Sequence, residues 1–331
     1  MALQAFLKSK SKIFTPFLAV LLFVGGFFVM RGILSVMESP LDLPVVSTEI
    51  AREEPAAKLP RLQLTDHSTL DCSNPNTYSN FEAALAATDP ACVIESRDGS
   101  VAGFPSNIGN LKKLATLKIY SNSISSVPPQ IGNLTNLLVL EINPFRDLSV
   151  AGVALKPDDP VTVLGTYIFA RNTFAELPRE IGALTNLTNL SVRGALLSEV
   201  PREIGNLHRL AELSLEDNRL TALPPEIAEL QLLKKLVLDQ NSLSELQFEI
   251  FKLTSLTELQ VADNSLTYIP RWISNLENLE TLDLRFNHLK ELPPEIGSLR
   301  KLKYLYLFGN EFSAEEISRI RALLPNTQII P

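Results

Sequence analysis

The chain has 331 residues, of which 45% are hydrophobic and 20% charged, so it can form one large repeat domain or two ordinary domains. Its formal net charge is −7. Residues 1–38 carry four basic residues and one acidic residue, a net +3, so the rest of the chain carries −10. This acidic remainder argues against a nucleic-acid partner, because phosphate binding needs a basic surface. The two cysteines and three histidines form no ligand cluster, so we expect neither a structural metal nor a cofactor.

Residues 13–37 are predicted to form a transmembrane helix that acts as an uncleaved anchor. The first 18 of these residues carry no charge, and Arg31 is the one basic residue in the segment. About 20 apolar residues span a bilayer core as a helix. Three lysines lie in the preceding short tail, residues 1–12, and the positive-inside tendency places that tail in the cytoplasm. The rest of the chain would then be extracytoplasmic, in the periplasm or at the cell surface.

Two other interpretations of residues 13–37 stay open. A cleaved signal peptide has an apolar stretch of about 7–15 residues, followed by small residues at the cleavage site. Here the stretch is longer and ends in bulky residues before Arg31. The second alternative is a buried helix of a soluble domain, although a repeat domain needs no uncharged run of this length outside its repeats.

Residues 38–64 contain four prolines and no clean periodicity, so we interpret them as a partly extended tether. Residues 65–110 are predicted to form an N-terminal cap with a helix over residues 78–88. Cys72 and Cys92 flank that helix and are predicted to form a disulfide outside the cytoplasm, worth about 3 kcal/mol in the chain-entropy model. The alternative is that they are two unconnected small apolar residues.

A 23-residue pattern repeats through residues 111–312. Its consensus is L-x-x-L-x-x-L-x-L-x-x-N-x-L-x-x-L-P-x-x-I-x-x, as in residues 276–298. One repeat cannot bury its apolar face alone, so the pattern predicts nine stacked coils of a solenoid. One unit is longer, with 27 residues. The units begin at Leu111, Leu134, Val161, Leu184, Leu207, Leu230, Leu253, Leu276 and Leu299.

The positions within the repeat predict its local structure. The L-x-L pair, such as Leu282 and Leu284, has the two-residue period of a strand with both leucines inward. The L-P-x-x-I segment suits a short helical turn, because proline donates no backbone hydrogen bond at its start. The predicted fold is therefore an α/β solenoid, a horseshoe with parallel strands on the concave face and short helical turns on the convex face. Caps are expected at both ends.

The asparagine after each strand is predicted to bond to backbone groups of the adjoining turns, which gives a ladder along the stack. Phe145 and Ala195 interrupt this ladder. The ladder residues are Asn122, Asn172, Asn218, Asn241, Asn264, Asn287 and Asn310.

These repeats resemble the leucine-rich-repeat superfamily. The L-P-x-E-I-G-x-L variant, seen at residues 177–184 and 292–299, is similar to the 23-residue class of plant intracellular Ras-group proteins and of many bacterial proteins. The segment FEAALAATDPACVIESRDGSVAGFP is similar to the N-terminal cap of bacterial repeat proteins. The resemblance implies the horseshoe fold and a binding role, since the superfamily binds proteins, peptides, glycans and lipids.

Residues that alternate with the strand leucines are predicted to face outward on the concave surface. In the last unit these residues are aromatic, and exposed clustered aromatics often mark an interface. In the middle units several are acidic and could attract a basic partner, although Arg193 and Lys235 dilute the field. The alternatives are aromatics that pack under the cap and a merely solvated acidic face. The candidate ligand-binding residues are Tyr304, Tyr306, Phe308, Asp283, Arg285, Glu258, Asp239, Glu212 and Glu216.

Residues 143–165, in the long unit, carry prolines and aspartates where the convex turn should be, so we interpret the extra residues as a loop on one face. Residues 313–331 are predicted to form a C-terminal cap helix, with Ser313 as N-cap and Glu316 completing a capping box.

The sequence carries none of the usual catalytic or nucleotide-binding fingerprints, so we expect no enzyme. The favoured hypothesis is a membrane-tethered module that binds a protein or peptide on the concave face. Binding of a glycan or cell-wall polymer is the second hypothesis, and a structural spacer without a specific ligand is the third. A fourth hypothesis keeps the solenoid in the cytoplasm.

Overall fold

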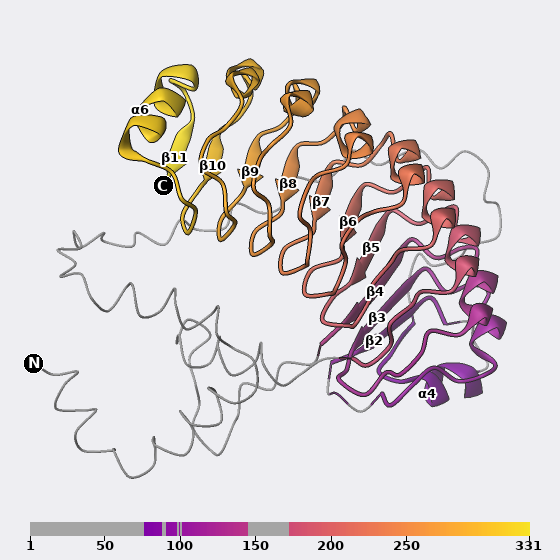
Figure 1. The fold of residues 1–331 in the computed structure, drawn as a ribbon. Helices are drawn as coiled ribbons and strands as arrows, with labels where there is room; N and C mark the ends of the chain where they lie inside the picture. Colours follow the sequence, from indigo (N-terminus) through magenta and orange to yellow (C-terminus); the bar gives the residue numbers. More distant parts are fainter. Residues whose placement is uncertain (1–75, 88–90, 98, 100, 145–171) are drawn as a thin grey trace, which may run out of the picture. The chain divides into compact units, whose positions relative to one another are not determined.

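The repeats stack their strands side by side into one sheet. The computed structural model describes residues 76–87, 91–97, 99, 101–144 and 172–331, all of which belong to one compact unit, residues 67–331. In this described part eleven strands lie in chain order, and each pairs in parallel with the next (Figure 1). The strands are β1 Thr77–Tyr78, β2 Val93–Ser96, β3 Thr116–Tyr120, β4 Val139–Asn143, β5 Asn189–Val192, β6 Glu212–Ser214, β7 Lys235–Val237, β8 Glu258–Gln260, β9 Thr281–Asp283, β10 Tyr304–Tyr306 and β11 Gln328–Ile330.

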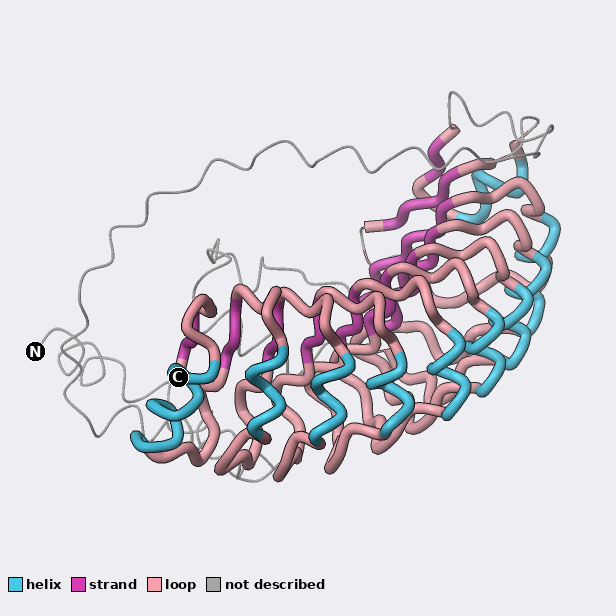
Figure 2. The backbone as a smooth tube through the Cα atoms, turned by 90° about the horizontal axis from the view of Figure 1, so that it is seen from above, coloured by secondary structure: helices cyan, strands magenta, loops and turns pink. Residues whose placement is uncertain are grey.

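Short 3₁₀ helices occupy the side of the coils opposite the sheet. Figure 2 shows them on the outer side of the curve, with the strands on the inner side. The predicted helical turns are thus 3₁₀ rather than α-helical, as in η9, where Pro293 in extended conformation is the N-cap and Pro294 the first residue. The helices are η1 Ile108–Asn110, η2 Pro129–Asn133, η4 Arg179–Ala183, η5 Arg202–Asn206, η6 Pro225–Glu229, η7 Phe248–Lys252, η8 Arg271–Asn275 and η9 Pro294–Ser298.

The core is the row of leucine and isoleucine side chains between the sheet and the 3₁₀ helices. Leu282 and Leu284, the L-x-L pair of one unit, are both 0% exposed, as is Ile296 from the 3₁₀ helix that covers them. Full burial of one such side chain contributes about 1.5–3 kcal/mol. Because every coil repeats these positions, one continuous apolar core runs through the stack.

The two ends of the solenoid carry short α-helices. In the N-terminal cap α4 spans Phe81–Ala86, shorter than the predicted residues 78–88, and the side chain of Asn80 accepts a hydrogen bond from Ala83 N at 2.8 Å. In the C-terminal cap α6 spans Ala314–Leu323, with Ser313 as N-cap. The carboxylate of Glu316 accepts a hydrogen bond from Leu292 N at 2.9 Å and so ties α6 to the preceding coil.

Strands from both caps extend the sheet beyond the predicted repeats. In the N-terminal cap β2 pairs with β3, and in the C-terminal cap β11 pairs with β10. The alternation in Val93–Ser96 and the β-branched Ile329 and Ile330 are strand signals that lie outside the repeat pattern. The caps therefore close the core by adding strands as well as helices.

The ladder asparagines hold successive coils together. Asn264 is 7% exposed, and its Nδ2 donates to the carbonyls of Leu238, Val261 and Ala262 at 3.0, 3.1 and 3.1 Å. Its Oδ1 accepts from Leu243 N at 3.0 Å. The Asn264 side chain thus bonds to two turns. The same acceptor bond, to an amide 21 residues earlier, is made by Asn218, Asn241, Asn287 and Asn310.

The prediction of a separate coil that begins at Val161 is wrong. Strand β4 pairs directly with β5, with Leu140 opposite Leu190, so no strand lies between them. Asn172 makes the ladder bond to Ile124 N at 3.0 Å, across 48 positions instead of the usual 21. The difference of 27 is the length of residues 145–171, which lie outside the described residues. The units that start at Leu134 and Val161 therefore form one 23-residue coil with an insertion at its ladder position.

This correction also changes the predicted concave face and domain boundaries. Thr166, Ile168 and Ala170, expected to face outward from a strand, lie outside the described residues and have no place between β4 and β5. The sequence predicts a coil here because residues 161–171 match the apolar spacing of the repeat. The register depends on which strands pair, and a local sequence pattern does not contain that information.

Several other predictions fall outside the described residues. These are the tail, the transmembrane helix over residues 13–37, the tether, and Cys72 of the predicted disulfide. Cys92 is 3% exposed in the N-terminal cap. Within the described ranges, no helix is both long and apolar enough to cross a bilayer.

We expect Asn264→Ala to lower the free energy of unfolding by about 2–4 kcal/mol, because it leaves buried backbone groups of two coils without partners. Chemical denaturation followed by circular dichroism measures this loss. Asn278→Ala is the control, since both bonds of Asn278 lie at the surface: its Nδ2 donates to the Thr254 carbonyl at 2.9 Å, and its Oδ1 accepts from Lys301 Nζ at 2.7 Å. Equal losses for the two variants would contradict a special role for the ladder.

Deletion of residues 145–171 is expected to preserve the fold, because Pro144 and Asn172 both lie against Gly194 and the join restores the 23-residue spacing. The thermal midpoint should stay within about 4 °C of the parent chain, which corresponds to roughly 1 kcal/mol. Scanning calorimetry tests this. Loss of cooperative unfolding would show that the inserted residues contribute a coil of their own.

Candidate functional site

The concave face is built from three rows of side chains that point away from the core. Within each strand the inward leucine alternates with outward residues. In β9, Thr281 and Asp283 therefore belong to the concave face, and Leu282 between them is buried in the core. Because the strands pair in register, equivalent positions of successive coils lie next to one another. The residues that determine this face are therefore neighbours across coils, 23 positions apart in the regular part of the chain.

Most of the charged residues on this face form ion pairs across neighbouring coils. Lys118 lies 2.9 Å from Glu141, and Lys235 lies 3.0 Å from Glu258. Arg193 pairs with Glu216 in the same way. The cations Arg193 and Lys235 thus neutralise Glu216 and Glu258, two of the acidic candidate residues. Exposed pairs of this kind add only about 0–1 kcal/mol of stability, so their main effect is on the charge that the face presents.

Asp283 and Arg285 bind each other within one coil. Arg285 Nη2 lies 2.6 Å from Asp283 Oδ2, and Arg285 Nε lies 2.9 Å from Asp283 Oδ1. The carboxylate is buried, with a side chain only 5% exposed. This bidentate pair leaves little of Asp283 for a ligand, whereas the Arg285 guanidinium also lies 5.3 Å from the centre of the Tyr306 ring.

Asp239 has a different environment from the other acidic residues. Its Oδ1 accepts from Ala262 N at 2.7 Å. Burial, reinforced by the negative charges of Asp283 and Glu216, raises the pKa of Asp239 to about 7, against the opposing effects of the Ala262 amide and Arg285. This carboxyl is therefore only partly ionised near neutral pH and contributes less charge than its residue type suggests.

The predicted aromatic residues of the last coil form an exposed patch together with Phe286. Tyr304 is 41% exposed, and Phe286 and Phe308 are each 47% exposed. The Phe286 and Phe308 rings meet edge to face at 5.4 Å, and those of Tyr304 and Tyr306 stack at 6.4 Å with an interplanar angle of 20°. We call Phe286, Tyr304, Tyr306 and Phe308 the aromatic patch.

Gly309 allows the Phe286 ring to lie in this patch. Its φ is +77°, and a Cβ there would lie 2.5 Å from Phe286 Cδ1. Phe286 itself has a φ of +50°, which is uncommon for an aromatic residue. The backbone thus holds this ring outward at the edge of the coil.

A hollow of about 710 Å³ lies over the middle of the concave face. Its floor is formed by Ser191 of β5 and Ser214 of β6, which are register partners. Glu212 borders the same floor and is exposed. Glu212 is a candidate from the sequence, whereas neither serine is, because a small residue at a strand position carries no signal until its neighbours are known.

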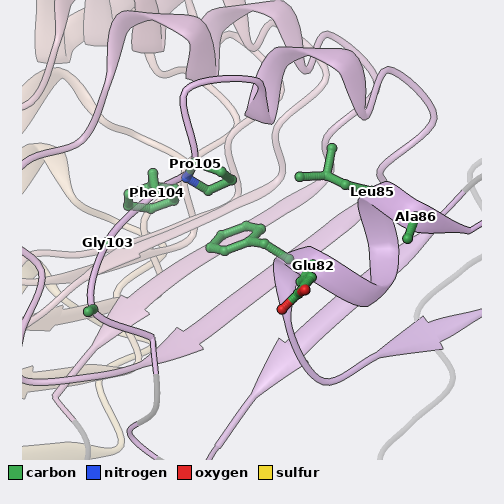
Figure 3. Close-up of a pocket in the computed structure, with 8 residues that line it drawn as sticks. Glu82, Leu85, Ala86, Gly103, Phe104 and Pro105 are labelled. Carbon is green, nitrogen blue, oxygen red and sulfur yellow. The ribbon is translucent and has the colours of Figure 1, made fainter.

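A second hollow, of about 780 Å³, lies at the N-terminal cap, where Leu85 faces the segment Phe104–Pro105 (Figure 3). Phe81 and Phe104 pack at 5.7 Å in its wall. Its lining holds one carboxylate, Glu82, and no cation. It is an open apolar surface at the end of the solenoid, away from the coils that carry the candidate residues.

The sequence analysis also missed an aromatic pair on the outer side of the coils. Phe248 of η7 and Trp272 of η8 are 43% and 39% exposed and meet edge to face at 5.2 Å. Arg271 lies over the Trp272 ring at 4.5 Å, and Lys252 over the Phe248 ring at 5.0 Å. These residues occupy repeat positions that elsewhere hold proline, arginine or glutamate, and that departure from the repeat is the signal that could have revealed them.

Among the described residues, no group of three or more His, Cys, Asp or Glu side chains could hold a metal ion. The arrangement on the concave face offers paired charges, aromatic rings and hydroxyl groups. Its chemistry is that of a binding surface.

Asp239→Asn should stabilise the protein at high pH. The folded-state pKa of about 7 exceeds the usual 3.8, so the stability contributed by the protonated carboxyl is complete below about pH 3.8 and is lost as the pH rises through about 7. Asparagine keeps the acceptor for Ala262 N without a charge. At pH 8.5 we expect the variant to exceed the parent by more than about 1 kcal/mol, with a much smaller difference at pH 4.5. Urea denaturation at both pH values measures this, and a difference independent of pH would contradict it.

Comparison with known proteins supports the fold. A leucine-rich-repeat family model matches residues 231–289, and a model of two such repeats matches residues 277–319. No curated protein matches the sequence. Together with the solved structures below, these matches support placing the chain in the leucine-rich-repeat superfamily.

Two of the similar solved structures are plant proteins. One is the leucine-rich-repeat ectodomain of the membrane receptor kinase GASSHO1/SCHENGEN3 from Arabidopsis thaliana, in complex with CASPARIAN STRIP INTEGRITY FACTOR 2. It is 30% identical, with a TM-score of 0.55 over 72% of this chain and 27% of that chain. PEPR1–AtPEP1 is 27% identical, with a TM-score of 0.52 over 69% of this chain and 29% of that chain. The present chain thus spans less than a third of either protein.

A bacterial structure shares the fold as well. Internalin C2 from Listeria monocytogenes is 22% identical, with a TM-score of 0.51 over 67% of this chain and 83% of that chain. At this identity the likeness concerns the solenoid architecture alone.

Proposed function

We propose that this protein is a non-enzymatic module that binds an extended peptide segment, free or part of a protein, along the concave face of its solenoid. The observation that carries the proposal is the aromatic patch. The face, most of whose charges are paired, ends in three rings that are 41% to 47% exposed, where a merely soluble surface would bury them or replace them. The peptide complexes among the similar plant structures support the same mode of binding.

The length of the face also favours a peptide or protein ligand. Neighbouring strands lie about 4.8 Å apart, so the face from β3 to β10 extends roughly 34 Å. An extended peptide of about ten residues has this length. Anchoring by a few aromatic residues, with weaker contacts between them, is the usual distribution of binding energy in such interfaces.

The proposal includes the membrane tether and the specific repeat class inferred from the sequence. The apolar residues 13–37 would anchor the chain, and the tether would extend the repeat domain away from the membrane on the extracytoplasmic side. The proline-rich convex turns and the 23-residue spacing support the class with the L-P-x-E-I-G-x-L variant. Protease protection of the full-length chain in sealed vesicles tests the orientation.

A glycan ligand is the alternative that one observation favours. The Tyr304 and Tyr306 rings are nearly parallel, with an interplanar angle of 20°, and such rings can stack on the faces of sugars. Binding of the purified chain to a glycan array, without selection of any peptide from a random library, would favour this alternative. A spacer without a ligand predicts neither kind of binding.

The triple variant Tyr304→Ala, Tyr306→Ala and Phe308→Ala should weaken binding of peptides that the parent chain selects from a random displayed library by at least about 30-fold, because loss of a buried aromatic anchor removes about 2 kcal/mol or more. The full-length chain in detergent is used, and fluorescence anisotropy gives the affinity. The matched control is Phe248→Ala with Trp272→Ala, which removes exposed rings from the outer side.

Circular dichroism establishes that both variants remain folded. Unchanged affinity in the folded triple variant, or equal losses in the two variants, would overturn the assignment of the aromatic patch as the anchor.

A further inference from the structure

The hollow over β5 and β6 is lined by both short and long side chains. Ser191 and Ser214 form its floor, and their register partners on either side are Glu141 and Val237. Both serines are half-buried, and their side chains are shorter than those of Glu141, Arg193 and Glu216, which also line the hollow. A side chain from a ligand that lies across the strands can therefore enter the face at this point.

The charges around the hollow are balanced except at one residue. Those of opposite sign pair as Arg97 with Glu95, Glu141 with Lys118, Arg193 with Glu216, and Lys235 with Glu258. Glu212, at the edge of the floor, has no such partner among the described residues. The lining of the hollow and its ion-pair partners together consequently carry one carboxylate in excess.

Lys235 does not remove this excess. It is the register partner of both Glu212 and Glu258, and its Nζ lies 3.0 Å from Glu258. Glu258 also accepts a hydrogen bond from Gln260 Nε2. One lysine between two carboxylates neutralises only one of them, so whichever carboxylate Lys235 contacts, the other is left for a ligand.

We propose that this hollow binds a basic side chain, arginine or lysine, of the bound peptide, with Glu212 as its counter-ion. The inference rests on the proposed peptide-binding function and assigns a second contact point for the same ligand. A guanidinium can bond a carboxylate through two parallel hydrogen bonds, and the hydroxyl groups of Ser191 and Ser214 can accept its remaining donors. An anionic group would meet the unpaired carboxylate, because the cations around the hollow already have partners.

The positions of the two contact points determine a spacing in the ligand. Glu212 of β6 and Tyr304 of β10 occupy the same register position, four strand spacings apart. Four spacings amount to about 19 Å. An extended peptide advances about 3.3 Å per residue, so the basic residue and the residue at the aromatic patch should be roughly six positions apart.

The test uses peptides selected by the full-length chain from a random displayed library. The expected consensus has an arginine or lysine about six positions from an apolar or aromatic residue. Glu212→Gln should weaken binding of a selected peptide about tenfold, and replacing the basic residue of the peptide with glutamine should weaken binding to the parent chain by the same factor. The two changes together should lose no more than either alone.

Glu229→Gln is the matched control, since it removes the same charge from an exposed residue of η6 on the outer side. It should leave the affinity unchanged. Glu258→Gln should weaken binding as well, because it frees Lys235 to neutralise Glu212.

The outcomes separate this inference from the function on which it rests. If the parent chain selects no peptide, the proposed function fails. If it selects peptides that depend on the aromatic patch but contain no basic residue and ignore Glu212→Gln, only the present inference is overturned. An acidic residue in the consensus at the predicted spacing would also overturn it.

Discussion

The structure depends on how each coil satisfies the backbone groups of its turns after a strand of only three to five residues in the regular repeats. A coil must leave the sheet, cross to the outer side and return, and the turns that do so are packed against neighbours on both sides. Buried amides and carbonyls there have no water to bond. The ladder asparagines supply those bonds from one coil to the next, as Asn264 does toward Leu243 and Leu238. Because the same bonds recur, every coil places its strand in the same register.

Because the strands keep one register, equivalent residues of successive repeats form one continuous concave surface. Leucines that alternate along each strand fill one core, and the residues between them become neighbours of residues one repeat away. The charged residues of this surface consequently pair across coils, as Lys235 does with Glu258. Glu212 lacks a cationic partner among the described residues, and Tyr304 and Phe308 place exposed rings where polar groups would otherwise lie. These positions are free to contact a ligand. The proposed ligand contacts thus lie where the surface departs from the pattern of charge pairs between neighbouring coils.

The insertion shows how robust this arrangement is. Residues 145–171 enter a coil at its ladder position, yet Asn172 takes that position and bonds to Ile124. The coils before and after keep their register, with Leu140 opposite Leu190. Lengthening the connection between two bonded coils adds only a small closure entropy, which the stack can accommodate.

The solenoid, the inward leucines, most of the ladder asparagines and the aromatic residues of the last coil could be predicted from the sequence. These follow from local period and residue type, because a two-residue alternation implies a strand and a 23-residue period implies stacking. Which strands are neighbours could not be predicted in this way. The folded structure excludes a coil between β4 and β5, pairs Glu216 and Glu258 with cations, and buries Asp283 beside Arg285. It also leaves Glu212 beside two serines, without an ion-pair partner among the described residues. Contacts between residues 23 or more positions apart carry no local signal, so their energies enter only when the coils are stacked.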